Sequence, residues 1–316
     1  MDKHQLNEII DCLPKERTLF PYFKGRYALM LLQAVVGQGR QVKDLKTSGF
    51  APLLDKPEVK QVLAQAGQGE VSAKFLENFW FGETYHFVLT LGSWGSGDHR
   101  WEQTSRRGCN LVLQLNFSNQ HDGMYRKMVK PQYELLLNRR SHPVLRPKQR
   151  LYFRETLAWS RIDLDFKSNE ALIEEVQNDW LREARYLLLD AKRLKSQNRK
   201  MQVWWASEGS VDDVIAYCEQ VLLPYYHIWD EAMLAATIDF IYRELGISNV
   251  YYHTEQTGYR VKNIKYDKPP RSLYSQLPKR FCFHQTSEAP GFLRKDKYFK
   301  RVYKKVENPR WFQLAL

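Results

Sequence analysis

The chain has 316 residues, of which 43% are hydrophobic and 14% aromatic, a composition that excludes an intrinsically disordered protein. Lys and Arg outnumber Asp and Glu by 48 to 36, and the net charge of +12 makes nucleic acid or another polyanion a plausible partner. The most apolar stretch, residues 27–36, is too short to cross a bilayer, and the start resembles no signal peptide, so we expect a cytoplasmic protein without a membrane partner.

Four widely spaced cysteines show neither CxxC nor Cys/His ligand spacing. This pattern argues against a zinc site and a disulfide framework. The first 80 residues have the spacing of helices, with an apolar run at residues 28–36 and a proline, Pro57, that suits a first helical turn. We therefore predict a helical N-terminal portion over residues 1–80, in which a helix pair that reads DNA remains an alternative.

From Tyr85 the hydrophobic period changes to two. Residues 85–91 and 109–117 each place apolar side chains on alternate positions, which predicts two strands. The connection between them, residues 92–101, contains three glycines that could hold a phosphate, but it reads more simply as a loop. Residues 126–150 form a basic connection, in which Arg139 and Arg140 are candidates for anion binding and a solvated loop is the alternative.

Two further strands, residues 157–166 and 171–179, are predicted on either side of a short polar turn. In the second strand the segment ALIEEVQNDW places Glu175, Gln177 and Asp179 on one face, where a buried strand would normally carry Val or Ile. That face either meets solvent or lines a site. The register of such a hairpin cannot be read from the sequence.

A charged helix is predicted over residues 180–200, and Ser210 is a good N-cap for a helix over residues 211–222 that Pro224 would end. A separate helix over residues 230–245 and a strand over residues 249–254 form an α-to-β unit, which implies a partly parallel sheet. The predicted fold class is α+β, with the helical portion followed by a mixed-sheet domain over residues 81–316.

The charge is unevenly distributed. Residues 201–250 carry one basic side chain against eight acidic ones, whereas residues 251–316 carry 15 against five. The basic end interleaves cations with aromatic residues, a mixture that suits either contact with phosphates and bases or a surface helix whose aromatics pack into the core. The anion-binding candidates in this end are Lys300, Arg301, Lys304 and Lys305.

Acidic residues of the predicted hairpin suggest one possible chemistry, that of a Mg²⁺-dependent nuclease. Asp163 or Asp165, followed by Glu175-Val176-Gln177 on the next strand, resembles the PD-(D/E)xK nuclease family in its variant with Gln in place of Lys. Carboxylate oxygens are suitable Mg²⁺ ligands, and the ion would activate a water. We also considered His253 and His121 as acid–base groups, since each has a carboxylate nearby in the sequence.

Two further resemblances concern the second half of the chain. IEEVQNDW is similar to the IEEIQSDW-type motif of large polyvalent proteins of phages and plasmids, over residues 157–255, and this resemblance implies no activity. The order of elements over residues 171–283 resembles the acetyl-coenzyme-A half of GNAT acyltransferases. That resemblance implies acetyl-CoA as the ligand and Tyr274 as the general acid.

The GNAT resemblance departs from the family at one place. The family's pyrophosphate loop contains glycines at the start of the helix that follows the central strand, whereas this chain has Asn178-Asp179-Trp180 there. No cofactor-binding residue can therefore be assigned from the sequence. The GNAT-like hypothesis requires the strands at 171–179 and 249–254 to be parallel and to separate at their C-terminal ends, and the nuclease hypothesis requires Asp163 or Asp165 to converge with Glu175.

Overall fold

The computed structural model describes residues 1–316 except 14–17, 96–102, 134, 146–153, 202–205 and 265–269. Most of the glycine-containing loop at residues 92–101 lies outside the described residues. The described strands form an eight-stranded mixed sheet, which confirms the predicted α+β class. Across the sheet the order is β1 (Thr18–Tyr22), β4 (Tyr85–Trp94), β5 (Asn110–Asn116), β6 (Thr156–Asp165), β7 (Glu170–Gln177), β8 (Asn249–His253), β10 (Trp311–Ala315) and β9 (His284–Thr286).

Neighbouring strands in this sheet are antiparallel, with the exception of β7 and β8, which are parallel. A parallel pair needs a long crossover, and here residues 178–248 supply it. The crossover contains α7 (Trp180–Ser196), α8 (Val211–Ala216) and α9 (Leu223–Asp239), with π-helical turns at Tyr217–Val221 and Phe240–Glu244. The prediction of a partly parallel sheet is thus confirmed, and its parallel pair is the one that the GNAT-like hypothesis requires.

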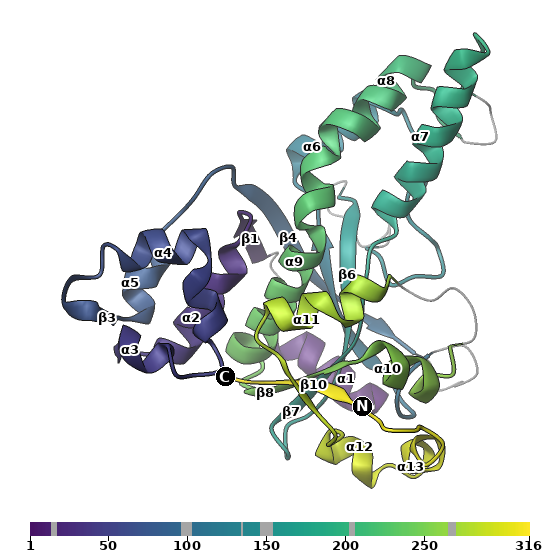
Figure 1. Ribbon diagram of the computed structural model, residues 1–316. Coiled ribbons are helices and arrows are strands. Elements are labelled where there is room, and N and C mark those ends of the chain that lie inside the picture. Colours follow the sequence, from purple (N-terminus) through teal and green to yellow (C-terminus); the bar gives the residue numbers. More distant parts are fainter. Residues whose placement is uncertain (14–17, 96–102, 134, 146–153, 202–205, 265–269) are drawn as a thin grey trace.

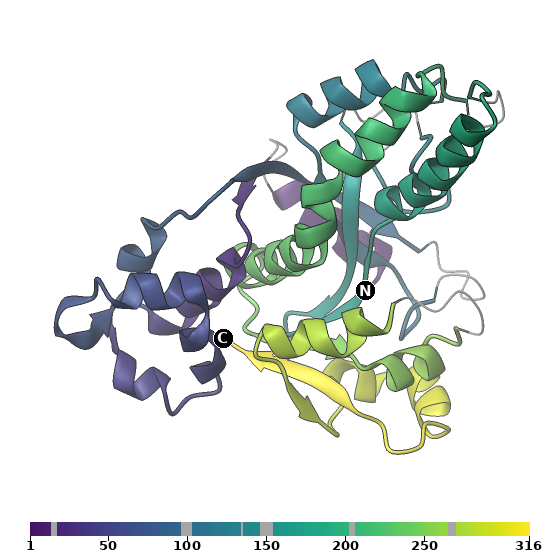
Figure 2. The ribbon, with the colours of Figure 1, turned by 45° about the horizontal axis from the view of Figure 1, so that its top comes forward.

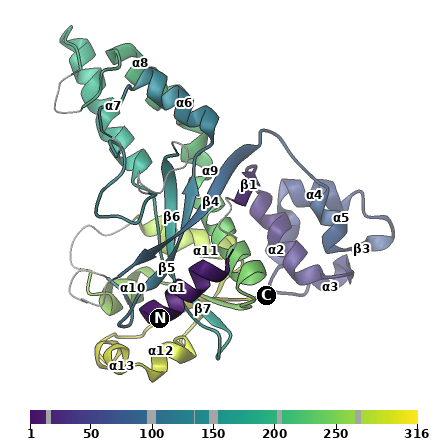
Figure 3. The same ribbon diagram turned by 180° about the vertical axis from the view of Figure 1, so that it is seen from behind.

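Helices cover both faces of the sheet. The apolar α9 packs on one face against β5, β6 and β7 (Figure 1), joined by α11 (Gln276–Arg280). From behind, α1 (Lys3–Cys12) lies across the other face (Figure 3). There a second hydrophobic cluster joins β7, β8 and β10 to α10 (Glu255–Val261), α12 (Gly291–Lys295) and α13 (Lys297–Tyr303). Covering on both faces explains why every residue of β5 is buried.

The N-terminal portion contains α2 (Arg26–Val36), α3 (Val42–Leu45), α4 (Pro57–Leu63), α5 (Ala73–Glu77) and a short pair of strands, β2 (Arg40–Gln41) and β3 (Glu70–Val71). These helices lie beside the sheet (Figure 2), and α2 and α9 contribute to one hydrophobic cluster. The prediction that this portion is wholly helical is wrong at Thr18–Tyr22, which forms the edge strand β1. Pro21 is compatible with that position because an edge strand tolerates an absent N–H.

The helix predicted over residues 211–222 ends at Val221, before Pro224, but a new helix that was not predicted begins immediately after it. Leu222 follows the π-helical turn and α9 begins at Leu223, so Pro224 lies in the first turn, where its missing N–H costs nothing. The helix predicted over residues 230–245 is therefore the second half of a longer one. Gly246 follows with a φ of +66°, the left-handed conformation that commonly ends a helix. Within the described residues no helix is long and apolar enough to span a membrane.

Candidate functional site

The pairing between the parallel strands β7 and β8 stops before β7 ends. They pair from Glu170 with Asn249 to Ile173 with Tyr252. Beyond this point β7 continues to Gln177 beside β6, while β8 ends at His253. No described strand pairs with the β8-facing side of residues 174–177. Of the two arrangements that the sequence left open for these strands, the structure has the parallel one, and we call this region the β7–β8 split.

A β-bulge lies at the start of the β7–β8 split. Arg161 of β6 pairs with Glu175, but the next residue, Ile162, pairs with Ile173, so Glu174 is an additional residue in β7. The side chains of Glu174 and Glu175 are both buried, which excludes a solvent-facing strand as the reason for their polarity. The bulge also decides the register of the hairpin, since it places Asp163 opposite Leu172.

Glu174 is the centre of a buried polar cluster. One carboxylate oxygen accepts the backbone N–H of Ser105 at 2.8 Å, and the other accepts the Ser105 hydroxyl at 2.8 Å and lies 3.0 Å from His253 Nε2. Burial alone would raise the pKa of this carboxyl, but the hydrogen bond from His253 and the positive charges of Lys262 and Arg161 lower it to about 2. Burial lowers the pKa of His253. A neutral His253 that donates from Nε2 to ionised Glu174 satisfies both directions.

This cluster does not have the geometry of a serine nucleophile triad. Ser105 Oγ and Glu174 both contact the same nitrogen of His253, Nε2, at 3.0 Å. In a triad the acid binds the other ring nitrogen and so orients the base toward the hydroxyl. His253, which the sequence suggested as a possible acid–base group, thus has Glu174 as its carboxylate partner, although the two are distant in the sequence. Glu174 binds the backbone N–H of Ser105, and His253 contacts the Ser105 hydroxyl.

Glu175 forms an ion pair with Arg161, whose guanidinium also donates to the backbone carbonyl of Gln103 at 3.1 Å. The Trp94 ring lies 5.1 Å from the same guanidinium. Burial would raise the pKa of the Glu175 carboxyl, but the charges of Arg161 and Lys262 lower it. Glu175 is therefore an ionised carboxylate at neutral pH with its charge already balanced.

Three buried polar atoms at the β7–β8 split have no hydrogen-bond partner among the described residues. They are the hydroxyls of Tyr252 and Tyr274 and the Nδ1 atom of His253. The two tyrosine rings stack with centroids 5.3 Å apart, and Lys262 Nζ lies 5.9 Å from the Tyr274 ring. Lys262 donates to the backbone carbonyl of Glu174 at 2.8 Å. A buried polar group without a partner costs about 1–3 kcal/mol, so an ordered water or a polar ligand group at these atoms would stabilise the fold.

Tyr274, proposed from the GNAT resemblance, thus lies at the β7–β8 split. It ends a short 3₁₀ turn, Arg271–Tyr274, and it is 3% exposed. Burial and the nearby charge of Glu175 raise the pKa of its hydroxyl well above the usual value. The hydroxyl therefore keeps its proton at neutral pH.

Asp179 occupies the place where the GNAT family has its pyrophosphate loop, at the start of α7. Its carboxylate lies 2.6 Å from His142 Nδ1, accepts from the Trp159 indole at 3.3 Å, and forms an ion pair with Arg182. Gln177 also donates to it, at 3.2 Å. Burial would raise the pKa of Asp179, but the hydrogen bond from His142 lowers it, so the side chain is an anion. A pyrophosphate group does not fit beside this buried carboxylate.

The carboxylates of the nuclease hypothesis are engaged elsewhere. Asp163 binds the Met1 amino group at 2.9 Å and the Arg106 guanidinium at 2.6 Å. Asp165 ends β6 and accepts from Ser168 in the turn. Among the described residues no group of three or more His, Cys, Asp or Glu side chains is arranged to hold a metal ion. His121, the other histidine considered, is buried, stacks on Phe117 at 3.5 Å, and has its pKa lowered to about 3 by burial.

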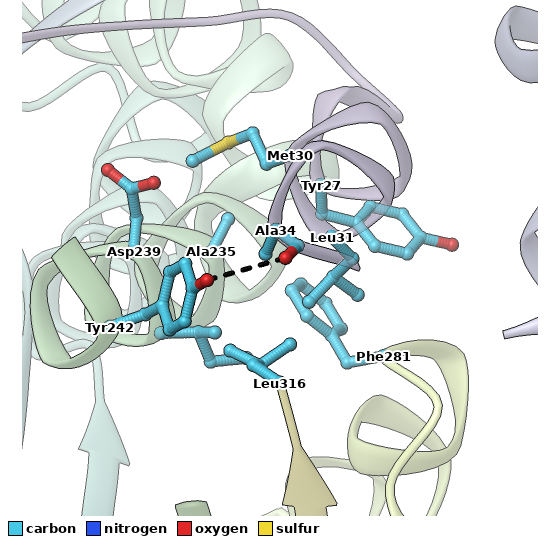
Figure 4. Close-up of a pocket in the computed structure, with 10 residues that line it drawn as sticks. Tyr27, Met30, Leu31, Ala34, Ala235, Asp239, Tyr242, Phe281 and Leu316 are labelled. Atoms are coloured by element: carbon cyan, nitrogen blue, oxygen red, sulfur yellow. Dashed lines mark hydrogen bonds between the residues drawn. The ribbon is translucent and has the colours of Figure 1, made fainter. Parts of the chain in front are cut away.

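Two cavities among the described residues lie away from the β7–β8 split. One lies between α2 and α9 (Figure 4), has mostly apolar walls, and holds about 10 Å³, room for one water. Its charged residue is Asp239, and the Tyr242 hydroxyl donates to the Ala34 carbonyl at 3.4 Å. The other, about 430 Å³, lies between the N-terminal portion and the start of α9. Neither includes a candidate site residue predicted from the sequence.

No described contact joins the anion-binding candidates to Glu174, His253, Lys262 or Tyr274. Arg139 forms an ion pair with Glu183 of α7, and Arg140 is exposed. The other candidates, Lys300, Arg301, Lys304 and Lys305, lie on or just after α13.

Sequence reasoning missed Glu174, Lys262, Ser105 and Tyr252 as members of the site. Two adjacent glutamates in one strand indicate a bulge, because without it one of them would point at the apolar face.

Comparisons of the chain with protein-family models, with curated proteins and with solved structures found no match.

Proposed function

We propose that this chain is an acyltransferase-related protein of GNAT-like architecture that binds an acyl donor at the β7–β8 split. One observation carries the proposal. The pairing of the single parallel pair in an otherwise antiparallel sheet stops at Ile173 and Tyr252, and three buried polar atoms of this region have no partner among the described residues. The GNAT-like hypothesis requires the two strands to separate there.

A split between parallel strands suits an extended ligand. The β8-facing backbone groups of residues 174–177 are not engaged by a described strand, so an extended amide-containing chain can hydrogen-bond there as an added strand would. The open end of parallel strands is also the usual position of ligand sites in sheets of this kind. Lys262 already donates to the Glu174 carbonyl, which marks one end of the available edge.

Tyr274 is suited to assist acyl transfer. A hydroxyl that remains protonated can donate a hydrogen bond to an acyl carbonyl or a proton to the leaving atom of the donor. Its ring is fixed by stacking on Tyr252, so the hydroxyl needs no reorganisation when the donor binds.

The donor is expected to lack a tightly held pyrophosphate. Asp179 is a buried anion at the start of α7, where glycine N–H groups would otherwise meet the phosphates. We therefore expect little difference in affinity between an acyl-coenzyme A and the corresponding acyl-pantetheine, which carries the same extended amide chain and thioester without the nucleotide.

The test is a thermal-shift and calorimetric titration with acetyl-pantetheine, acetyl-coenzyme A and Mg²⁺, each alone. Stabilisation by the two thioesters to a similar extent supports the proposal, because only a ligand that prefers the folded state raises its stability. Tyr274→Phe should weaken thioester binding at least tenfold, since it removes the hydroxyl but keeps the ring. Tyr226→Phe, at a half-exposed tyrosine on α9, is the matched control and should bind as the wild type does.

Two results would oppose the proposal. Stabilisation by Mg²⁺ without any by the thioesters would favour the nuclease hypothesis. Equal binding of thioester by wild type and Tyr274→Phe would place the donor elsewhere on the molecule.

A further inference from the structure

A second feature, unrelated to the β7–β8 split, lies on α12, α13 and the segment that follows. Residues 291–310 carry eight cations against two carboxylates. All eight are exposed. They are Arg294, Lys295, Lys297, Lys300, Arg301, Lys304, Lys305 and Arg310, and we call them the C-terminal basic surface.

The charges of the C-terminal basic surface are not neutralised within the described part of the chain. None of the eight forms an ion pair there. One of the two nearby carboxylates, Asp296, is engaged as the N-cap of α13, where it accepts the N–H of Phe299 at 2.7 Å. The positive potential of this surface is therefore available to a partner.

Some cations elsewhere on the molecule do form ion pairs. The acidic stretch of the crossover, residues 208–244, pairs with cations of neighbouring helices. Lys192 binds Glu219 at 2.5 Å, and Lys195 binds Asp212 at 2.7 Å. Five carboxylates of this stretch form ion pairs among the described residues, and none of these pairs involves the C-terminal basic surface.

The helices that carry this surface are firmly packed. Phe292, Phe299 and Trp311 are buried in the second hydrophobic cluster. Of the two interpretations of the interleaved aromatics, the structure supports packing in the core, and these three rings are not available for stacking with bases. The backbone that carries the cations is thereby fixed, so a partner does not have to order these helices when it binds.

The chemistry of the surface fits a phosphate backbone better than a lipid bilayer. A helix that lies on a membrane presents large apolar side chains for insertion, and the exposed large hydrophobic residues of the described chain include none between 291 and 310. A surface of cations without exposed aromatics suits recognition of nucleic acid through its phosphates, with little dependence on base sequence. We infer that the C-terminal basic surface binds the phosphate backbone of nucleic acid.

The experiment measures anisotropy of a fluorescein-labelled 20-base-pair DNA duplex and of a 20-nucleotide RNA over a series of salt concentrations. The test variant is Lys300→Gln/Lys304→Gln/Lys305→Gln. The control is Lys3→Gln/Lys43→Gln/Lys46→Gln, which removes the same formal charge from exposed lysines elsewhere. Thermal unfolding of all three proteins verifies that they are folded.

We expect the test variant to bind at least tenfold more weakly at low salt and the control less than twofold. The slope of log Kd against log salt concentration should fall by about 2–3 in the test variant, since each phosphate contact contributes about 0.9. Equal losses in the two variants would overturn the inference, because binding would then follow net charge alone. Binding of anionic phosphatidylserine vesicles without binding of either nucleic acid would also overturn it. The outcome is independent of the thioester titration.

Discussion

Replacement of Glu174 by Gln tests the energetics of the β7–β8 split directly. The substitution preserves the shape of a fully buried side chain and removes its charge. In the folded protein the pKa of this carboxyl is lowered from 4.5 to about 2. A pKa that is lower by about 2.5 in the folded protein than in the unfolded chain corresponds to roughly 3 kcal/mol of stability at neutral pH. Since a domain of this kind is stable by about 5–15 kcal/mol, Glu174→Gln should fold but be clearly weakened.

The sign of the pH dependence follows from the lowered pKa. Stabilisation by Glu174 is complete above the unfolded value of 4.5 and is lost as pH falls toward about 2. The difference between wild type and Glu174→Gln should therefore be about 3 kcal/mol at pH 7 and narrow to about 2 kcal/mol at pH 3.5.

Urea unfolding followed by tryptophan fluorescence provides the measurement, since the Trp311 ring lies 4.8 Å from that of His253. Glu77→Gln is the control, because Glu77 is exposed in α5, and it should change stability by less than about 0.5 kcal/mol. A loss below about 1 kcal/mol in Glu174→Gln, or a difference that does not change with pH, would refute the reasoning.

Two other predictions concern groups near the sheet. Gly258→Ala in α10 would place a Cβ 3.1 Å from His253 Cβ, so it should destabilise the protein by about 1–3 kcal/mol. Gly123→Ala in α6 (Asn119–Met128) adds a Cβ with nothing within 4 Å, so it should stabilise the protein by up to about 1 kcal/mol. Urea midpoints that move in the same direction for both variants would contradict this. Burial lowers the pKa of His121 to about 3, so the wild type should lose stability as pH falls below 6.5, by about 2 kcal/mol at pH 5 relative to pH 7. His121→Gln should show less of this loss. Identical pH profiles of stability for the two proteins would exclude the explanation.

The parts of this fold that the sequence predicts are those set by local pattern. The strands at residues 85–91 and 109–117, the helix from Trp180, the N-cap at Ser210 and the strand from Asn249 all follow from period, capping and turn residues. The edge strand Thr18–Tyr22 is missed because a proline normally argues against a strand. β10 is missed because its short apolar run follows a long basic segment.

The candidate site was less predictable because its contacts span long distances in the sequence. Glu174 meets Ser105 across 69 residues and His253 across 79. Neither separation carries a local signal. Tyr274 could be placed only by resemblance to a family, and Lys262 lies in a helix that the sequence pattern did not reveal. Residues whose role depends on register or on a crossover cannot be found by periodicity alone.

The bulge and the end of the β7–β8 pairing lie at neighbouring residues of the chain. Glu174, the additional residue of β7, comes directly after Ile173, the last residue that pairs with β8. A bulge bends its strand and increases the local twist, so β7 is turned away from β8 where the two separate. The same additional residue makes Glu174 and Glu175 both buried polar groups, each with a basic partner, instead of one polar and one apolar position. The two adjacent glutamates of β7 and the end of its pairing with β8 are therefore parts of a single structural feature.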